Sequence, residues 1–120
     1  MKIAISSLDE SINSNLNPRF GRCEYFIIYD CDSGNFTAVE NSGRLSTGGA
    51  GIATAKMVAD LGVKVIITGL VGPKAFTALK AAGIKVYTAN EGKILELIEQ
   101  YKNNQLKEVN TANSGAHSGM

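Results

Sequence analysis

Apolar positions within Ser46–Tyr87 follow the spacing of helices and strands in alternation. A glycine-rich turn precedes an amphipathic stretch, the wholly apolar run Val65–Ile67, a second glycine turn and a second amphipathic stretch. A short β-branched run without polar positions is typical of a strand covered on both faces. Pro73 after Gly72 suits the first residue of a helix, and Gly83 suits the residue just after its end. The pattern predicts an αβαβ unit with parallel strands.

The flanking residues predict three more strands and one more helix. A turn at 31–35 is rich in Asp, Ser, Gly and Asn, which favours a hairpin between the strands on either side. In the first helix, Ile52, Ala55 and Ala59 are expected to face the core. The expected strands are Lys2–Ser6, Glu24–Asp30, Phe36–Glu40, Val65–Ile67 and Ile84–Tyr87, and the expected helices are Ala50–Leu61, Pro73–Ala82 and Gly92–Lys102.

These elements predict an α/β fold with a five-stranded mixed sheet and three main helices. The hairpin makes the second strand antiparallel to the third, and crossover connections make the third, fourth and fifth strands parallel. With the first strand in the middle, the order is 3-2-1-4-5 and the second strand is the lone antiparallel member. We expect one domain over residues 1–106 and a flexible carboxyl-terminal tail over 107–120, where apolar residues are few.

This strand order places a candidate site at one edge of the sheet. The carboxyl ends of the first, third and fourth strands meet there, so the loops 7–23, 41–49 and 69–72 converge. In open α/β sheets, ligands bind at that edge. The site is therefore predicted from topology before any motif is considered.

The glycine turns at this edge suit an anion. Each opens a predicted helix, whose first backbone N–H groups and positive dipole end favour negative charge. Neither turn matches a dinucleotide fingerprint or a P-loop. An alternative stays open, in which the glycines only permit tight turns and close packing. The candidate residues in these turns are Thr47, Gly48, Gly49, Gly51, Gly69, Gly72 and Lys74.

A second candidate segment, Arg19–Cys23, enters the same edge. Arg19 and Arg22 supply charge-assisted donors, and Gly21 lets a ligand approach the backbone. Cys23 is a candidate thiolate ligand for a soft metal, with a pKa that the arginines would lower. The alternative is that Phe20 fills the core and Cys23 is a small buried apolar residue.

Composition narrows the function classes. The net charge of +1, with both signs spread along the chain, gives no footprint for nucleic acid, and no apolar run approaches a membrane span. Two cysteines and no leader pattern favour a cytoplasmic protein with free thiols. The single histidine, His117, lies in the predicted tail. No nucleophile–base set or paired catalytic carboxylates can be assembled, so we expect no enzyme.

Two segments of the chain resemble the dinitrogenase iron–molybdenum cofactor biosynthesis family. They are RFGRCEYFIIYD, starting at Arg19, and GGAGIATAKMVADLGVKVIITGLVGPKAFTALKAAGIKVY, starting at Gly48. The combination of VGPKAF, AGIKVY and RFGR is the most specific part, and the resemblance covers residues 1–106. The family includes small nitrogenase accessory proteins and the carboxyl-terminal domain of the cofactor-cluster synthase.

The resemblance implies a ribonuclease H-like fold and a non-enzymatic role. That role is to bind or carry an iron–sulfur or iron–molybdenum cluster precursor between donor and acceptor proteins. Members implicated in cofactor binding often carry a histidine just before the glycine turn, where this chain has Ser46 and Thr47. Two alternatives stay open: a module without metal that binds a small anion or nucleotide, and a protein-interaction domain.

Overall fold

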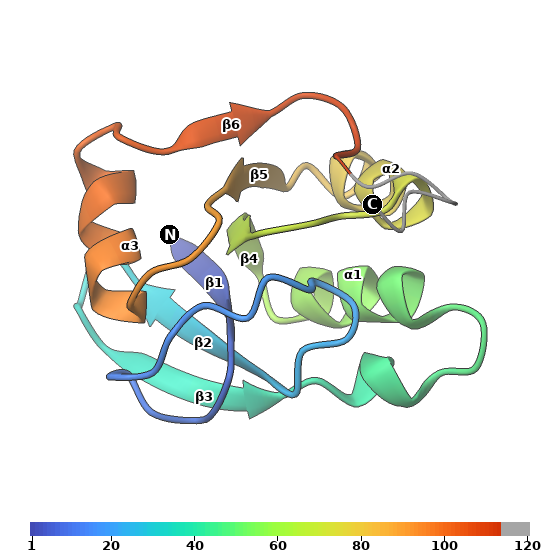
Figure 1. The fold of residues 1–120 in the computed structure, drawn as a ribbon, viewed down its shortest axis with the longest axis horizontal. Helices are drawn as coiled ribbons and strands as arrows, with labels where there is room; N and C mark the ends of the chain where they lie inside the picture. Colours follow the sequence, from blue (N-terminus) through green and yellow to red (C-terminus); the bar gives the residue numbers. More distant parts are fainter. Residues whose placement is uncertain (114–120) are drawn as a thin grey trace.

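The computed structural model describes residues 1–113, which form one mixed sheet with helices on both faces (Figure 1). The predicted features of residues 114–120, His117 among them, lie outside the described residues. The strands are β1 (Lys2–Ser7), β2 (Tyr25–Asp30), β3 (Phe36–Glu40), β4 (Val63–Thr68), β5 (Lys85–Thr88) and β6 (Lys107–Val109). The helices are α1 (Ala50–Asp60), α2 (Pro73–Ala81), α3 (Ile94–Lys102) and the short 3-10 helix η1 (Ser42–Leu45).

The sheet has six strands in the order β3-β2-β1-β4-β5-β6, so the predicted order 3-2-1-4-5 is confirmed and the predicted number is wrong. β1 is antiparallel to β2 and parallel to β4, as expected. The extra strand, β6, is antiparallel to β5, with Val109 opposite Val86, so β2 is not the lone antiparallel strand. β6 lies where we expected a tail. It is held because Val109 and Ala112 pack against the core.

The core has two parts, one on each face of the sheet. Ala4 of β1 belongs to the part covered by α1 and α2, whereas its neighbours Ile3 and Ile5 belong to the part covered by α3. β1 therefore lies between the helices of the two faces (Figure 1), and its side chains are buried on both faces of the sheet. Within residues 1–113, no helix has both the length and the apolar character needed to cross a membrane.

The buried face of α1 differs from the predicted one. Ala55 is buried as expected, but Ile52 is 46% exposed and Thr54 is fully buried in its place. The reason is a hydrogen bond: the Thr54 hydroxyl donates to the buried Asn41 side chain at 3.0 Å. A satisfied polar residue thus occupies the core, and Ile52 is left at the surface.

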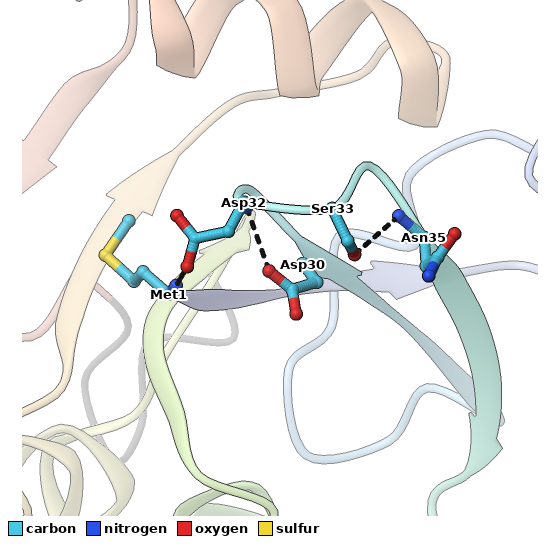
Figure 2. Close-up of polar contacts among 5 residues, drawn as sticks. All are labelled: Met1, Asp30, Asp32, Ser33 and Asn35. Atoms are coloured by element: carbon cyan, nitrogen blue, oxygen red, sulfur yellow. Dashed lines mark hydrogen bonds and ion pairs between the residues drawn. The ribbon is translucent and has the colours of Figure 1, made fainter.

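The β2–β3 hairpin turn is fastened to the start of the chain at the end of the sheet away from the loops 7–23 and 69–72. The Met1 ammonium donates to the Asp32 carboxylate at 2.8 Å, which raises the pKa of the amine (Figure 2). Asp30 and Ser33 side chains accept from backbone N–H groups two residues further on. These local bonds order the turn that sets the β2–β3 register.

Candidate functional site

Three loops form a cleft of about 530 Å³ at the sheet edge where β1 and β4 end. They are the loops that the predicted strand order brings to one edge of the sheet. Predicted ligand-binding residues that line the cleft are Phe20, Gly21, Arg22, Gly48, Gly49, Gly51, Gly72 and Lys74. Ala50, Ile52, Pro73 and Ala75 complete the lining. The residues are thus brought together, while their binding of a ligand stays a prediction.

Three predicted residues do not line the cleft. Gly69 is buried against Pro18, so close that a Cβ at Gly69 would lie 2.6 Å from the Pro18 carbonyl oxygen. Arg19 forms an isolated bridge with Leu70. Thr47 is exposed on the loop before Gly48. Gly69 is therefore a packing residue, as the alternative interpretation of the glycines proposed.

The first turns of α1 and α2 both open onto the cleft. The N-cap residues are Gly49 and Gly72, and no side chain within residues 1–113 caps the start of either helix. The N-cap carbonyls accept the N–H groups of Ala53 and Phe76 at 2.9 Å, so the N–H groups of the first helical turns remain for another acceptor. Two positive helix ends directed at one cleft favour an anion.

Small residues allow the three walls of the cleft to approach. A Cβ on Gly21 would lie 2.9 Å from the Gly51 Cα, and a Cβ on Gly51 would lie 3.0 Å from the Ala75 Cβ. Gly48 adopts a φ of +75°, which favours glycine. Glycine at positions 21 and 51 therefore lets the 18–23 loop pack directly against the start of α1, and the start of α1 against α2.

The charges in the cleft wall are positive. Arg22 and Lys74 are the charged residues of the lining in the described part of the chain, and both are exposed. Ile52, which is half-exposed, adds an apolar surface beside them. An anion with an apolar or polarizable surface suits this combination better than a strongly hydrated cation.

A buried amide fixes the position of the 18–23 loop. Asn41 is fully buried, and its Nδ2 donates to the Cys23 carbonyl at 3.0 Å and to the Gly21 carbonyl at 3.4 Å. Its Oδ1 accepts from the Gly43 N–H and the Thr54 hydroxyl, each at 3.0 Å. One side chain thus ties the loop to both η1 and α1.

The sequence profile described as dinitrogenase iron–molybdenum cofactor matches residues 1–104. The chain belongs to this family. One relative of this chain is an uncharacterized protein of Methanocaldococcus jannaschii. The two are 39% identical over 110 residues, which are 89% of this chain and 90% of the relative. The cofactor family predicted from RFGR, VGPKAF and AGIKVY is therefore confirmed.

Solved structures agree with this membership. The apo form of the orange protein from Desulfovibrio gigas has a TM-score of 0.90 and 34% identity, covering 94% of this chain and 96% of that one. A NifB-related protein from Thermotoga, solved by NMR, has a TM-score of 0.82 and 39% identity, covering 92% and 94%. Both solved structures therefore share the α/β fold described above.

Cys23 does not have the environment expected of a metal ligand in this cofactor-family member. Its side chain is fully buried in the core under α1 and α2, and Sγ donates to the Phe20 carbonyl at 3.3 Å. Burial raises its pKa to about 12, so the expectation that nearby arginines lower it is wrong. A thiol must lose its proton to bind a metal. The alternative, a small buried apolar residue, describes Cys23 better.

The described part of the chain offers no other metal-ligand set. No cluster of three or more His, Cys, Asp or Glu residues able to hold a metal ion occurs within residues 1–113. Ser46 and Thr47, which stand where family members often have histidine, supply hydroxyl groups only. Among the described residues, the cleft offers a ligand the backbone N–H groups of two helix starts and the cationic side chains of Arg22 and Lys74.

The sequence does not predict two residues that hydrogen-bond to the loops of the cleft: Asn41, in the predicted loop 41–49, bonds to the Cys23 carbonyl, and Asn113, in the predicted tail, bonds to the Gly69 carbonyl. The only sequence signal for Asn41 was its position directly after a strand and two residues before Gly43, which is typical of an amide that accepts from a nearby backbone N–H. Asn113 has no such local signal.

Proposed function

We propose that this member of the cofactor family is a non-enzymatic carrier or scaffold for an iron–sulfur or iron–molybdenum cluster precursor. The observation that carries the proposal is the convergence of two side-chain-uncapped helix starts on one cleft with Arg22 and Lys74. Clustered backbone N–H groups are a known kind of site for phosphates and iron–sulfur clusters. The family, whose description names the iron–molybdenum cofactor, supports a cluster as cargo.

The same cleft supports binding without metal–protein bonds. Among the described residues 1–113, those that line it include no cysteine, histidine, aspartate or glutamate. A cargo held there keeps a full set of its own ligands, such as sulfide or small thiolates, and is retained as an anion. Such binding is reversible, because release breaks no coordination bond, and reversible binding is what a carrier requires.

Related features of the proposal follow from the family and the fold. The strand order 3-2-1-4-5 with an antiparallel β2 supports the ribonuclease H-like assignment. Both cysteines are free thiols, which supports a reducing, cytoplasmic location. We propose protein partners that donate and accept the cargo, and we propose no nucleic acid, membrane or catalytic role.

The first test is anaerobic reconstitution with iron, sulfide and a small thiol that supplies terminal ligands. Protein-bound iron and visible absorption are measured for the wild type and for the double variant Arg22→Gln with Lys74→Gln. We expect the double variant to bind about tenfold more weakly, because both cationic donors are lost. Lys80→Gln, at the other end of α2, is the matched control and should bind like the wild type.

The role of Cys23 is tested in the same assay. We expect Cys23→Ser to take up cargo like the wild type, once its folding has been verified by circular dichroism. Reduced uptake by folded Cys23→Ser would show that the thiol is a ligand after all. No uptake by the wild type would contradict the carrier function.

The absence of soft ligands from the cleft also favours a second candidate, an anion-binding module without metal. Tetrathiomolybdate and molybdate distinguish the two, because they share charge and shape and differ only in sulfide against oxide. The carrier function predicts tighter binding of the sulfide anion. Equal binding of molybdate or inorganic phosphate would favour the second function, and binding of neither would favour a protein-interaction domain.

A further inference from the structure

The carboxamide of Asn113 holds the loop that leads into α2. Its Oδ1 accepts the Val71 N–H at 2.8 Å, and its Nδ2 donates to the Gly69 carbonyl at 2.7 Å. The two bonds engage a donor and an acceptor two residues apart, as a neighbouring strand would. Asn113 lies just beyond β6, in a segment whose Ala112 packs against the core.

The Val71 N–H depends on this bond. Val71 is 1% exposed, and the Asn113 side chain supplies the acceptor for its N–H. The Gly69 carbonyl has a second partner in the Thr88 hydroxyl at 3.0 Å, so it stays satisfied without Asn113. Removal of the amide leaves this partly buried donor without its partner, so the loop must move or admit water.

The other side of this loop contacts the 18–23 loop, which forms a wall of the cleft. The Leu70 N–H donates to the Pro18 carbonyl at 2.7 Å, and the Phe20 N–H donates to the Leu70 carbonyl at 3.3 Å. Gly72, two residues after Leu70, is the N-cap of α2. The loop is thus held between Asn113 on one side and a wall of the cleft on the other.

We propose that Asn113 is a positioning residue for the cleft, which holds the Gly69–Gly72 loop and the first turn of α2 in the arrangement that binds an anion. Its effect on affinity rests on the proposed function, whereas its effect on the loop does not. Asn113 touches no cargo and acts through Val71 and Gly69. Because linkage is reciprocal, an anion in the cleft strengthens the attachment of Asn113 in return.

The test uses the full chain and four proteins: wild type, Asn113→Ala, Asn113→Asp and Asn110→Ala. Amide exchange of Val71 and the chemical shifts of the Lys74 and Ala75 N–H groups are measured first, without added anion. Tetrathiomolybdate is then titrated, and its dissociation constant is measured from its visible absorption. Asn110 is exposed in the same segment and provides the matched control.

For Asn113→Ala we expect Val71 exchange to quicken about tenfold or more. The Lys74 and Ala75 signals should shift, and tetrathiomolybdate should bind about fivefold more weakly. Asn113→Asp keeps an acceptor for the Val71 N–H but loses the donor to Gly69, so its exchange should lie between that of Asn113→Ala and that of the wild type, whereas its added negative charge should weaken the binding of tetrathiomolybdate relative to the wild type. Asn110→Ala should match the wild type.

Two outcomes would overturn the positioning role. In the first, Asn113→Ala lowers the unfolding midpoint while Lys74, Ala75 and the affinity stay unchanged, which makes the residue structural only. In the second, Asn110→Ala and Asn113→Ala behave alike. If the wild type binds no tetrathiomolybdate, the carrier function fails instead, and the Lys74 and Ala75 shifts alone decide the positioning role.

Discussion

The backbones of Gly21 and Gly51 touch across the wall of the cleft. A Cβ on Gly21 would lie 2.9 Å from the Gly51 Cα and 3.0 Å from its nitrogen. Gly51 lies in the first turn of α1, so this contact joins the RFGR segment to a helix start. The geometry of the cleft therefore depends on glycine at positions 21 and 51, where a side chain would push the loop and the helix apart.

Gly21→Ala should therefore destabilise the fold. The new methyl group meets backbone atoms, which cannot rotate away, so the loop or α1 must shift. Overpacking of this kind costs about 1–3 kcal/mol. The loss is measured as a lower free energy of unfolding in urea.

Gly51→Ala is the matched comparison. Its methyl group would meet the Ala75 Cβ at 3.0 Å rather than backbone atoms. Alanine also improves helix propensity by about 1 kcal/mol relative to glycine, which offsets the contact. We expect a smaller loss than for Gly21→Ala, and an equal or larger loss would contradict the steric ranking of the two sites.

Asn41→Ala should cost more than removal of its partner hydroxyl in Thr54→Val. Asn41 satisfies the Gly43 N–H and the Cys23 carbonyl in a fully buried place, so its loss leaves several groups unpaired. Each buried unpaired group costs about 1–3 kcal/mol. Thr54→Val removes the bond to Asn41 at 3.0 Å and a longer one to the Gly21 carbonyl at 3.5 Å. Urea unfolding of both variants checks the order, and similar losses would show that Asn41 acts only through Thr54.

The position of the cleft could be predicted because it follows from local patterns. The apolar run Val65–Ile67, the Pro73 helix start and the hairpin turn define the elements, and connection rules then leave one plausible order. The strand order then determines which loops lie at the same edge of the sheet. Phe20–Arg22 and Gly48–Gly51 were therefore placed together correctly without any knowledge of their contacts.

The remaining errors concern contacts between distant residues. β6 forms because Val109 pairs with Val86 and packs against the core. These contacts cannot be read from the sequence of a three-residue segment alone. Thr54 replaces Ile52 in the core because Asn41, 13 residues earlier, supplies a buried acceptor. The pKa of Cys23 was expected to fall because two arginines are near in sequence, but burial has the larger effect.

Burial of the Cys23 thiol predicts a loss of stability in alkaline solution. Its pKa rises from the ordinary 9.0 to about 12 in the folded chain. Between these values the unfolded chain has lost the thiol proton and the folded chain has kept it, so the free energy of unfolding falls as the pH rises. The stabilisation is fully present below pH 9 and is lost progressively toward pH 12, by up to about 1.4 kcal/mol per pH unit.

Urea unfolding of wild type and Cys23→Ala at about pH 8 and about pH 10 measures this loss. Cys23→Ala should be less stable than the wild type at the lower pH, because it leaves a small cavity, but should lose less stability between the two. Cys31 remains in both proteins. Burial also raises its pKa, so it contributes the same background to each. An equal loss in the two proteins would show that Cys23 ionises as readily in the folded chain as in the unfolded one, and would reopen its role as a thiolate ligand.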